Sequence, residues 1–477
     1  MVLRVELITF LIFWISMEPM LCQVKALEID KKPIPNIEQT LSFEEYLGYV
    51  KKYHPLMKQA NILLHIGEAN LLKARGGFDP KIEVDYDRKK FKETEYFDQL
   101  NATFKIPTWY GIDFKANFEK NTGDYLNPNL TVPEDGLYSA GVSFSLARGL
   151  LMNERMALLK KAHFFRNQTK AERDVVLNNL LFEAGNAYLD WLEATKEQEI
   201  YADFMENALL RLKAIEKSVE AGDKAAIDSI EAGIILQNRK LNLETATLKK
   251  RKAVLMVSNY LWVNDVPVEI REDIAPVVPD LKTLEISLST KAGVASTNVS
   301  LENHPKIVSL NAKIDGLSVE RSLKRNQLLP KVDLQYNFLT PDFDQLNTLN
   351  TANYKAFVNV RFPLFLRKER GDLKLTNLKL KDTNLERLFT SLQLQNKIEA
   401  VNTEIISLRK QNALINTIVQ DYKTLVKAEE RKFFLGESSL FLINSREQKL
   451  INAQLKENKL TIKNLIAITK LYNALGI

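Results

Sequence analysis

The side chains that could carry acid–base, metal or nucleophilic chemistry are few and scattered in this sequence. Its 477 residues hold four histidines, and two of them, His54 and His304, stand directly before a proline at the start of a helical stretch. A histidine beside a helix-opening proline is typical of a helix start. The sequence has no glycine-rich phosphate loop, paired-cysteine metal motif or nucleophile elbow. We therefore expect a protein that is not an enzyme and that carries no cofactor and no metal.

The net charge of +6 is small for a chain of this length. Lysines and arginines are interleaved with aspartates and glutamates along the helical stretches, which is typical of a solvated helix face. No basic stripe with interleaved aromatics is present, so we expect no nucleic-acid partner.

The first residues predict an export signal. Arg4 precedes an apolar run over residues 7–17, and Val24–Ala26 offers the small residues that a signal peptidase reads. The run is too short to cross a bilayer, so we assign residues 1–26 to a signal peptide. The only cysteine, Cys22, lies just after this run, where bacterial lipoproteins carry their lipid. Lipidation and removal with the signal both remain open for it, and the bulky neighbour Leu21 favours removal.

The chain repeats its own pattern with an offset of about 250 residues. Residues 54–86 pass from a His-Pro pair through a helical stretch to a proline and a strand-like run, and residues 304–336 do the same. The segment Gly222–Asp228 likewise has a counterpart in Gly436–Leu442. A repeat of this kind decides the architecture before any single motif does. We divide the chain into repeat 1 (27–262, strands within 81–146, hairpin turn near 222–228), a linker or equatorial segment (263–300) and repeat 2 (301–477, strands within 331–362, hairpin turn near 436–442).

Six short runs alternate apolar and polar residues. Such alternation predicts strands with one apolar and one polar face. The polar face carries full charges in almost every run, so it must contact water, while the apolar face has too few strands to form a sandwich. An apolar outside against lipid and a charged inside against a wet lumen fits both facts. The runs are 81–87, 101–106, 113–119, 142–146, 331–338 and 355–362.

A sheet in lipid must close into a barrel, because an open edge leaves backbone groups unpaired. Two strands per repeat give about four per chain, or six if the extra alternating runs of the first copy also join. Neither number closes a wide barrel from one chain. We therefore expect several chains to share the barrel. Aromatic residues near the strand ends predict contacts with the membrane interface, and these are Trp109, Tyr110, Tyr138 and Tyr354.

The remaining sequence predicts helices that are too long for a globular domain. Residues 148–221 contain no proline, and apolar residues from Leu177 to Ala194 step by three and four. The second copy shows the same spacing from Ile398 to Val426, interrupted by Asn412. This spacing indicates coiled-coil packing, and about 70 residues in one helix reach about 100 Å. Each long helix ends at a glycine turn and returns as a shorter helix, the second of which Ser438 or Ser439 would cap.

Taken together, these features resemble the TolC-like outer-membrane efflux family, also called outer membrane factors. The resemblance runs from Leu41 to Leu475 and rests on the His-Pro openings, the Pro-Lys strand starts at Pro80 and Pro330, the strand exits and the glycine turns. It implies an α+β membrane protein, a homotrimer whose outer-membrane β-barrel continues as a periplasmic α-helical coiled-coil tunnel. It also implies an exit duct that works with a periplasmic adaptor protein and an inner-membrane transporter of RND or ABC type.

The resemblance further implies that the two hairpin turns contact the adaptor. The residues concerned are Gly222, Asp228, Gly436, Ser439 and Leu442, and Leu442 replaces the acidic residue that Asp228 supplies in the first copy. We expect passive export of small molecules or drugs across the bacterial outer membrane. A duct for type I protein secretion is one alternative. A periplasmic coiled-coil scaffold without a barrel is another, although it leaves the alternating runs unexplained.

Overall fold

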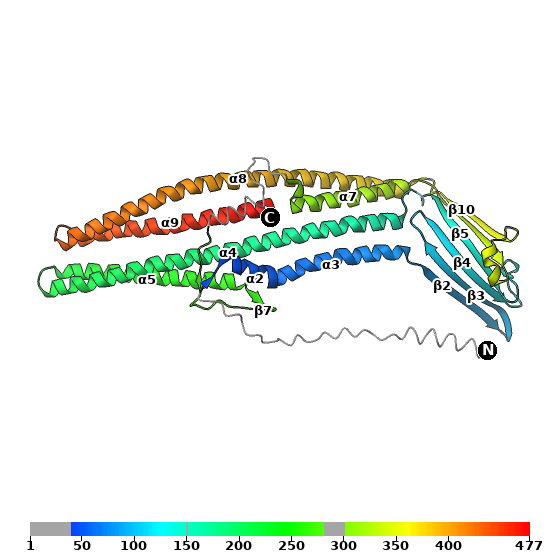
Figure 1. The fold of residues 1–477 in the computed structure, drawn as a ribbon, viewed down its shortest axis with the longest axis horizontal. Helices are drawn as coiled ribbons and strands as arrows, with labels where there is room; N and C mark the ends of the chain where they lie inside the picture. Colours follow the sequence, from blue (N-terminus) through cyan, green and yellow to red (C-terminus); the bar gives the residue numbers. More distant parts are fainter. Residues whose placement is uncertain (1–39, 149–150, 281–300) are drawn as a thin grey trace. The chain divides into compact units, whose positions relative to one another are not determined.

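A computed structural model describes residues 40–148, 151–280 and 301–477 (Figure 1). The predicted signal peptide, Cys22 and the second half of the predicted linker lie outside the described residues. Helices and strands keep the labels of Figure 1 throughout.

Six antiparallel strands form one sheet in the order β10-β9-β5-β4-β3-β2. Each alternating run of the sequence lies in one of these strands. The prediction of about four strands per chain is therefore too low, because the first copy supplies four strands and the second copy two. The two copies meet at β5 and β9, where Tyr138 is paired with Thr340. The strands are β2 (Lys81–Phe91), β3 (Thr94–Pro107), β4 (Ile112–Thr122), β5 (Leu137–Ala147), β9 (Lys331–Thr340) and β10 (Tyr354–Arg361).

The two faces of this sheet differ as the alternation predicts. On the polar face, side chains bond between strands: Lys115 of β4 reaches past β5 to donate to Gln335 of β9 at 3.0 Å, and Ser145 of β5 donates to Asp333 of the neighbouring β9 at 2.9 Å. On the apolar face, large side chains are open to the surroundings, and Ile82 is 75% exposed. A water-soluble sheet would bury that face against another layer.

In the described residues, the α-helices form two long hairpins and three shorter pieces (Figure 1). The long members, α4 and α8, have 67 and 68 residues, close to the predicted length. Their shorter returns begin after the glycine turns, and Ser439 caps the second return as predicted. The helices are α2 (Phe43–Tyr53), α3 (Pro55–Arg75), α4 (Glu154–Glu220), α5 (Ala226–Ser258), α7 (Pro305–Asn326), α8 (Arg367–Phe434) and α9 (Leu440–Leu475).

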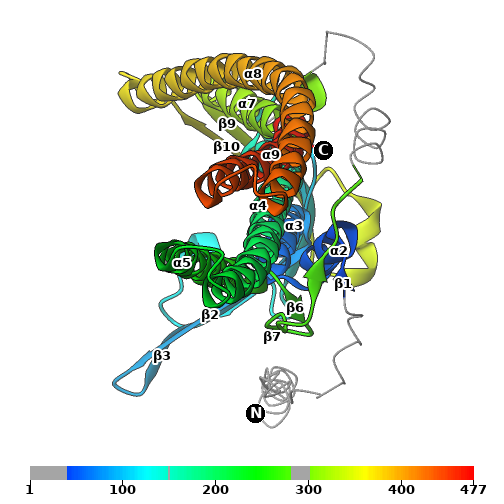
Figure 2. The same ribbon diagram turned by 90° about the vertical axis from the view of Figure 1, so that its left-hand side faces the viewer.

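Short helices follow one another along the long ones. Both α3 and α5 pack on α4, and both α7 and α9 pack between α4 and α8. Viewed from the hairpin turns, the two hairpins lie next to each other with α4 against α9 (Figure 2). Within one chain, α5 and α8 are therefore the outer members of this helical layer.

The coiled-coil seam of the second copy is confirmed as a packed core. Ile398, Val401 and Val419 are buried together with apolar residues of α9. Asn412, the interruption in this seam, donates its amide to the carbonyl oxygens of Leu408 at 3.0 Å and Leu460 at 3.2 Å. The polar residue is therefore satisfied within the seam, as a buried amide must be.

Two short β pairings lie around α2 and involve residues that follow α5 in the sequence. The parallel pair β1 (Thr40–Leu41) and β8 (Ala275–Pro276) lies against α4, and the buried Tyr188 donates its hydroxyl to the carbonyl of Leu41 at 2.7 Å. A two-residue ribbon, β6 (Trp262–Val263) with β7 (Val266–Pro267), covers α2. Of the described helices, none has the length and apolarity needed to cross a membrane.

Candidate functional site at the helical-hairpin turns

The turn after α4 is closed by a glycine in the left-handed region. Gly222 has φ +83° and donates its N–H to Val219 at 3.0 Å, while Asp223 donates to Ser218 at 2.8 Å. These two bonds satisfy carbonyl groups that the helix end leaves without partners, in the arrangement known as a Schellman motif. Glycine adopts this backbone without a steric penalty.

The turn after α8 has the same geometry. Gly436 has φ +78° and donates to Phe433 at 3.0 Å, and Glu437 donates to Lys432 at 2.9 Å. A Cβ added at either glycine meets nothing within 4 Å. Backbone conformation, and not crowding, therefore requires glycine at both turns. The glycine-turn prediction is correct at the level of local structure.

The helices that follow the two turns start differently. Ser439 caps α9 by accepting from the backbone of Leu442 at 3.4 Å. The matching residue Ala225 cannot cap α5, but Asp228 places a carboxylate in the first turn of that helix. A negative charge there interacts favourably with the helix dipole. Asp228 and Leu442, predicted as adaptor-contacting residues, thus occupy equivalent positions with different chemistry.

An apolar cluster joins the two turns to each other. Ile215 of α4, Ala232 of α5 and Leu440 of α9 are buried together. Beside them, the Lys224 ammonium lies 3.8 Å from the centre of the Phe433 ring, a cation–π contact between the two hairpins. The turns are therefore held as one unit within the chain.

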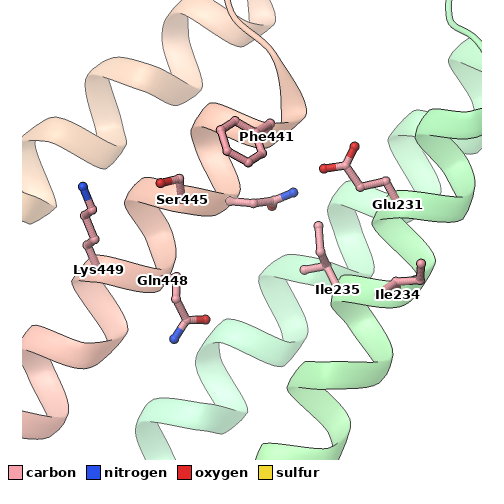
Figure 3. Close-up of a pocket in the computed structure, with 8 residues that line it drawn as sticks. Glu231, Ile234, Ile235, Phe441, Ser445, Gln448 and Lys449 are labelled. Atoms are coloured by element: carbon pink, nitrogen blue, oxygen red, sulfur yellow. The ribbon is translucent and has the colours of Figure 1, made fainter.

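A groove runs between α5 and α9 next to this unit (Figure 3). Its volume is about 430 Å³. Ile234 and Ile235 line the α5 side, and Phe441 projects from the α9 side toward Glu231 (Figure 3). Asn444, Ser445, Gln448 and Lys449 complete the α9 side. The groove is therefore apolar where the helices begin and polar further along α9.

Large apolar side chains surround the turns without cover from the chain itself. Phe434, the last residue of α8, is 90% exposed, and Phe441 is also mostly exposed. Leu435 and Ile227 are exposed beside them. Clustered exposed apolar residues of this kind indicate a protein contact surface.

A buried ionic cluster lies directly under the groove. The carboxylate of Glu447, which is 1% exposed, accepts two hydrogen bonds from Arg211 of α4, both at 3.2 Å. Arg239 of α5 lies 3.4 Å from the same carboxylate and donates to Gln448 at 2.6 Å. This Arg211–Glu447–Arg239 cluster therefore ties both helices of the first hairpin to α9. Nothing in the sequence sets this cluster apart, because its members look like ordinary charges on helical faces.

A second polar contact closes the α8–α9 turn. Glu429 of α8 accepts from the hydroxyl of Ser438 at 2.5 Å and from Arg446 of α9 at 2.7 Å. The hydrogen bond from Ser438, together with that from Arg446, lowers the pKa of Glu429. The described α4–α5 turn has no counterpart to this contact, since the equivalent positions hold Ile215, Lys224 and Ala232.

The four aromatic residues predicted at strand ends fall into two groups. Trp109 and Tyr110 lie in the β3–β4 turn, where the Trp109 ring stacks on Phe78 at 5.6 Å. Tyr138 and Tyr354 begin β5 and β10 at the opposite end of the sheet. No group of three or more metal-ligating side chains is found in the described parts of the chain.

Comparison with known proteins identifies the fold. Residues 297–477 match the family model of the outer membrane efflux protein. The match covers repeat 2, 181 of the 477 residues. In this part the chain is similar to outer-membrane efflux proteins.

Several solved structures share the fold of this chain. The Campylobacter jejuni CmeC outer membrane channel has a TM-score of 0.64 at 14% identity, over 91% of this chain and 85% of that one. VceC from Vibrio cholerae has 0.61 at 14%, over 91% and 96%. The open state of the Neisseria gonorrhoeae MtrE channel has 0.61 at 11%, over 93% of both chains. No curated protein matches the sequence.

Proposed function

We propose that this chain is the outer-membrane exit duct of a tripartite efflux pump that exports small molecules. The observation that supports this most strongly is the combination of a sheet with an uncovered apolar face and a helical layer that ends in an uncovered apolar groove. The sheet suits a membrane, and the groove suits a periplasmic partner. In this proposal the duct itself is passive, because the sequence holds no glycine-rich phosphate loop that could bind a nucleotide.

The two lateral edges of the chain support a homotrimer. The edge strands β2 and β10 are exposed along almost their whole length and pair on one side only. In lipid an unpaired edge is costly. Pairing of β2 in one copy with β10 in the next removes both edges, and three copies close the ring as the family resemblance implies.

Exposed apolar stripes on the helices support the same contact. On α5, Leu241, Leu248 and Leu255 repeat every seven residues and are exposed. On α8, the exposed leucines 378, 385 and 392 repeat at the same interval. These helices are the outer members of the layer, so a second copy can cover both stripes by coiled-coil packing. A head-to-tail contact of this kind generates a ring.

The groove between α5 and α9 supports an adaptor of helical-hairpin type. An amphipathic helix binds by placing apolar side chains into a groove of this form. Ile234 and Phe441 would contact its apolar face, while Glu231 and Lys449 would select its charges. The transporter in the inner membrane, of RND or ABC type, would then supply the energy for export.

The test replaces the native gene by the double variant I234E/F441E in the source bacterium. We expect drug and dye accumulation to rise to the level of the deletion strain, because two carboxylates in an apolar groove would repel the adaptor helix. The matched control is Lys456→Glu, which adds the same charge at an exposed position further along α9 and should leave export unchanged.

Two results would contradict the proposal at different points. Normal export in I234E/F441E, with the protein present in the outer membrane, would show that the groove is not the adaptor site. A deletion strain that accumulates no dye but loses a secreted protein would replace small-molecule efflux by type I protein secretion.

A further inference from the structure

A second pocket lies far from the groove, where the start of α7 meets the end of α9. It has a volume of about 430 Å³ and lies between α4, α7, α8 and α9. Its polar lining includes Asn178 and Asn179 of α4, His304 and Lys306 at the start of α7, and Lys397 of α8. None of the twelve described residues that line it carries a carboxylate. We call it the α7–α9 pocket.

The imidazole of His304 in this wall has a donor without a partner. Its Nδ1 caps α7 by accepting from the backbone of Lys306 at 3.1 Å, which places the proton on Nε2. This Nε2 atom is buried, in a residue that is 5% exposed, and it finds no acceptor among the described residues. Burial, and then the charges of Lys306 and Lys397, lower the pKa of His304 to about 4. The ring is therefore neutral at neutral pH, and an N–H donor is left over.

In the first copy of the repeat, the equivalent histidine has a hydrogen-bond partner for its ring. His54 caps α3 in the same way, accepting from Leu56 at 3.2 Å. Its ring also bonds to the backbone of Asn259 and stacks on Tyr260 at 5.7 Å. In the second copy, Asn473, Ala474 and Gly476 stand at the positions of Asn259, Tyr260 and Trp262, so the aromatic cover of the ring is missing. Two lysines, Lys306 and Lys397, lie near this ring.

The lysines of the pocket lack counter-ions. Lys397 donates to the neutral side-chain oxygen of Asn473 at 2.8 Å. Burial, and then the charges of Lys306 and Lys470, lower the pKa of Lys397. Among the described residues, no carboxylate lies within ion-pair distance of Lys306 or Lys397, whereas Lys470 is paired with Glu404 at 3.4 Å. The positive end of α7 adds to the same potential.

We infer that the α7–α9 pocket binds a small oxyanion, the phosphate or carboxylate group of a solute. Lys306 and Lys397 supply the charge, and the pocket amides supply directional donors. Such an anion would balance the two lysines, and charge-assisted hydrogen bonds to an oxyanion are the strong ones. The inference does not rest on the proposed efflux function.

Titration calorimetry of the detergent-extracted full-length protein tests it, with inorganic phosphate in one arm and acetate in the other. Both titrations use neutral chloride buffer at matched ionic strength. We expect saturable binding in at least one arm, weakened tenfold or more in K397Q and in K306Q. The arm that binds identifies the phosphate or the carboxylate as the preferred group.

Matched variants keep the outcome clear. K410Q removes an exposed lysine of α8 outside the pocket, and H54N changes the equivalent cap in the first copy; both should bind as the parent protein does. K397R keeps the charge and should keep most of the affinity. A loss of affinity in K397Q would then come from the lost charge and not from misfolding. Absence of saturable binding in both arms, or equal affinity in K397Q and the parent, would overturn the inference.

Discussion

Glu447 is the residue whose removal should matter most for the described fold. Its buried carboxylate faces two guanidinium groups, Arg211 and Arg239, that reach it from different helices. Replacing it by Gln leaves Arg239 without a counter-ion among the described residues and leaves Arg211 with only the half-exposed Glu430, in a desolvated seam. Breaking a buried ion pair in this way costs about 3–5 kcal/mol. We expect E447Q to lower the thermal unfolding midpoint clearly and to open the seam between α4 and α9 to proteolysis.

The same arginine offers a matched control. Glu430 lies 3.5 Å from Arg211, but its side chain is half exposed. An exposed ion pair contributes little, so E430Q should unfold within experimental error of the parent protein. Equal losses in E430Q and E447Q would show that the cluster does not act through burial.

At the scale of elements, the two glycine turns predict the direction in which a substitution changes thermal stability. Both glycines have positive φ and free space around the position of a Cβ. An alanine there adds only the left-handed backbone penalty, about 1 kcal/mol for each turn. We therefore expect G222A and G436A to be mildly destabilised in thermal unfolding, and valine at either position to be worse.

Gly233 gives the opposite sign and is the control. It lies inside α5 with negative φ and has nothing within 4 Å of an added Cβ. Alanine stabilises an exposed helix interior relative to glycine by about 0.5–1 kcal/mol. G233A should therefore gain stability, and a loss there would mean that the helix is covered by something at this position.

The contact that closes the α8–α9 turn predicts a dependence on pH. Ser438 and Arg446 hold the pKa of Glu429 below that of a free glutamate, about 4.3. The ionised contact therefore stabilises the turn above that pH, and the stabilisation is lost as the pH falls through the lower folded value. We expect amide exchange at residues 436–439, corrected for intrinsic rates, to accelerate below about pH 4 more than at residues 222–225. In E429Q the two turns should respond alike.

The strands, long helices and caps could be predicted because each follows from local pattern. Alternation placed β2 from Ile82 onward, and His304 and Ser439 are caps whose chemistry is visible within three residues. Of the two strand counts that the sequence left open, six and not four is found, because the extra alternating runs of the first copy also pair into the sheet. Contacts between distant helices could not be predicted: nothing near Glu447 in the sequence distinguishes it from a solvated glutamate, since Arg211 and Arg239 reach it from more than 200 residues away.

At the scale of the whole molecule, one chain has unpaired strand edges and uncovered helix surfaces on both of its sides. Each side combines an unpaired strand with exposed leucines on the adjoining helix layer, β2 with α5 on one side and β10 with α8 on the other. Two different surfaces that complement each other join copies head to tail, and such contacts either close into a ring or continue as a filament. The oligomer is therefore expected to have one definite size, set by curvature of the sheet.

Cross-linking between the edge strands tests that expectation directly. In a background without Cys22, we place cysteines at Glu83 of β2 and Asn359 of β10, which lie on the polar face of the sheet. Five strand spacings separate these edges within one chain, about 24 Å along the sheet, so a short bismaleimide should join only neighbouring copies. We expect denaturing gels of the double variant to show dimer and trimer bands, and the single variants only monomer.

The extracted particle should scatter light as about three times the 54.6 kDa chain. Bands that continue beyond trimer would indicate an open filament, and a cross-link confined to the monomer would show that β2 and β10 pair within one chain, which would remove the physical argument for a shared barrel.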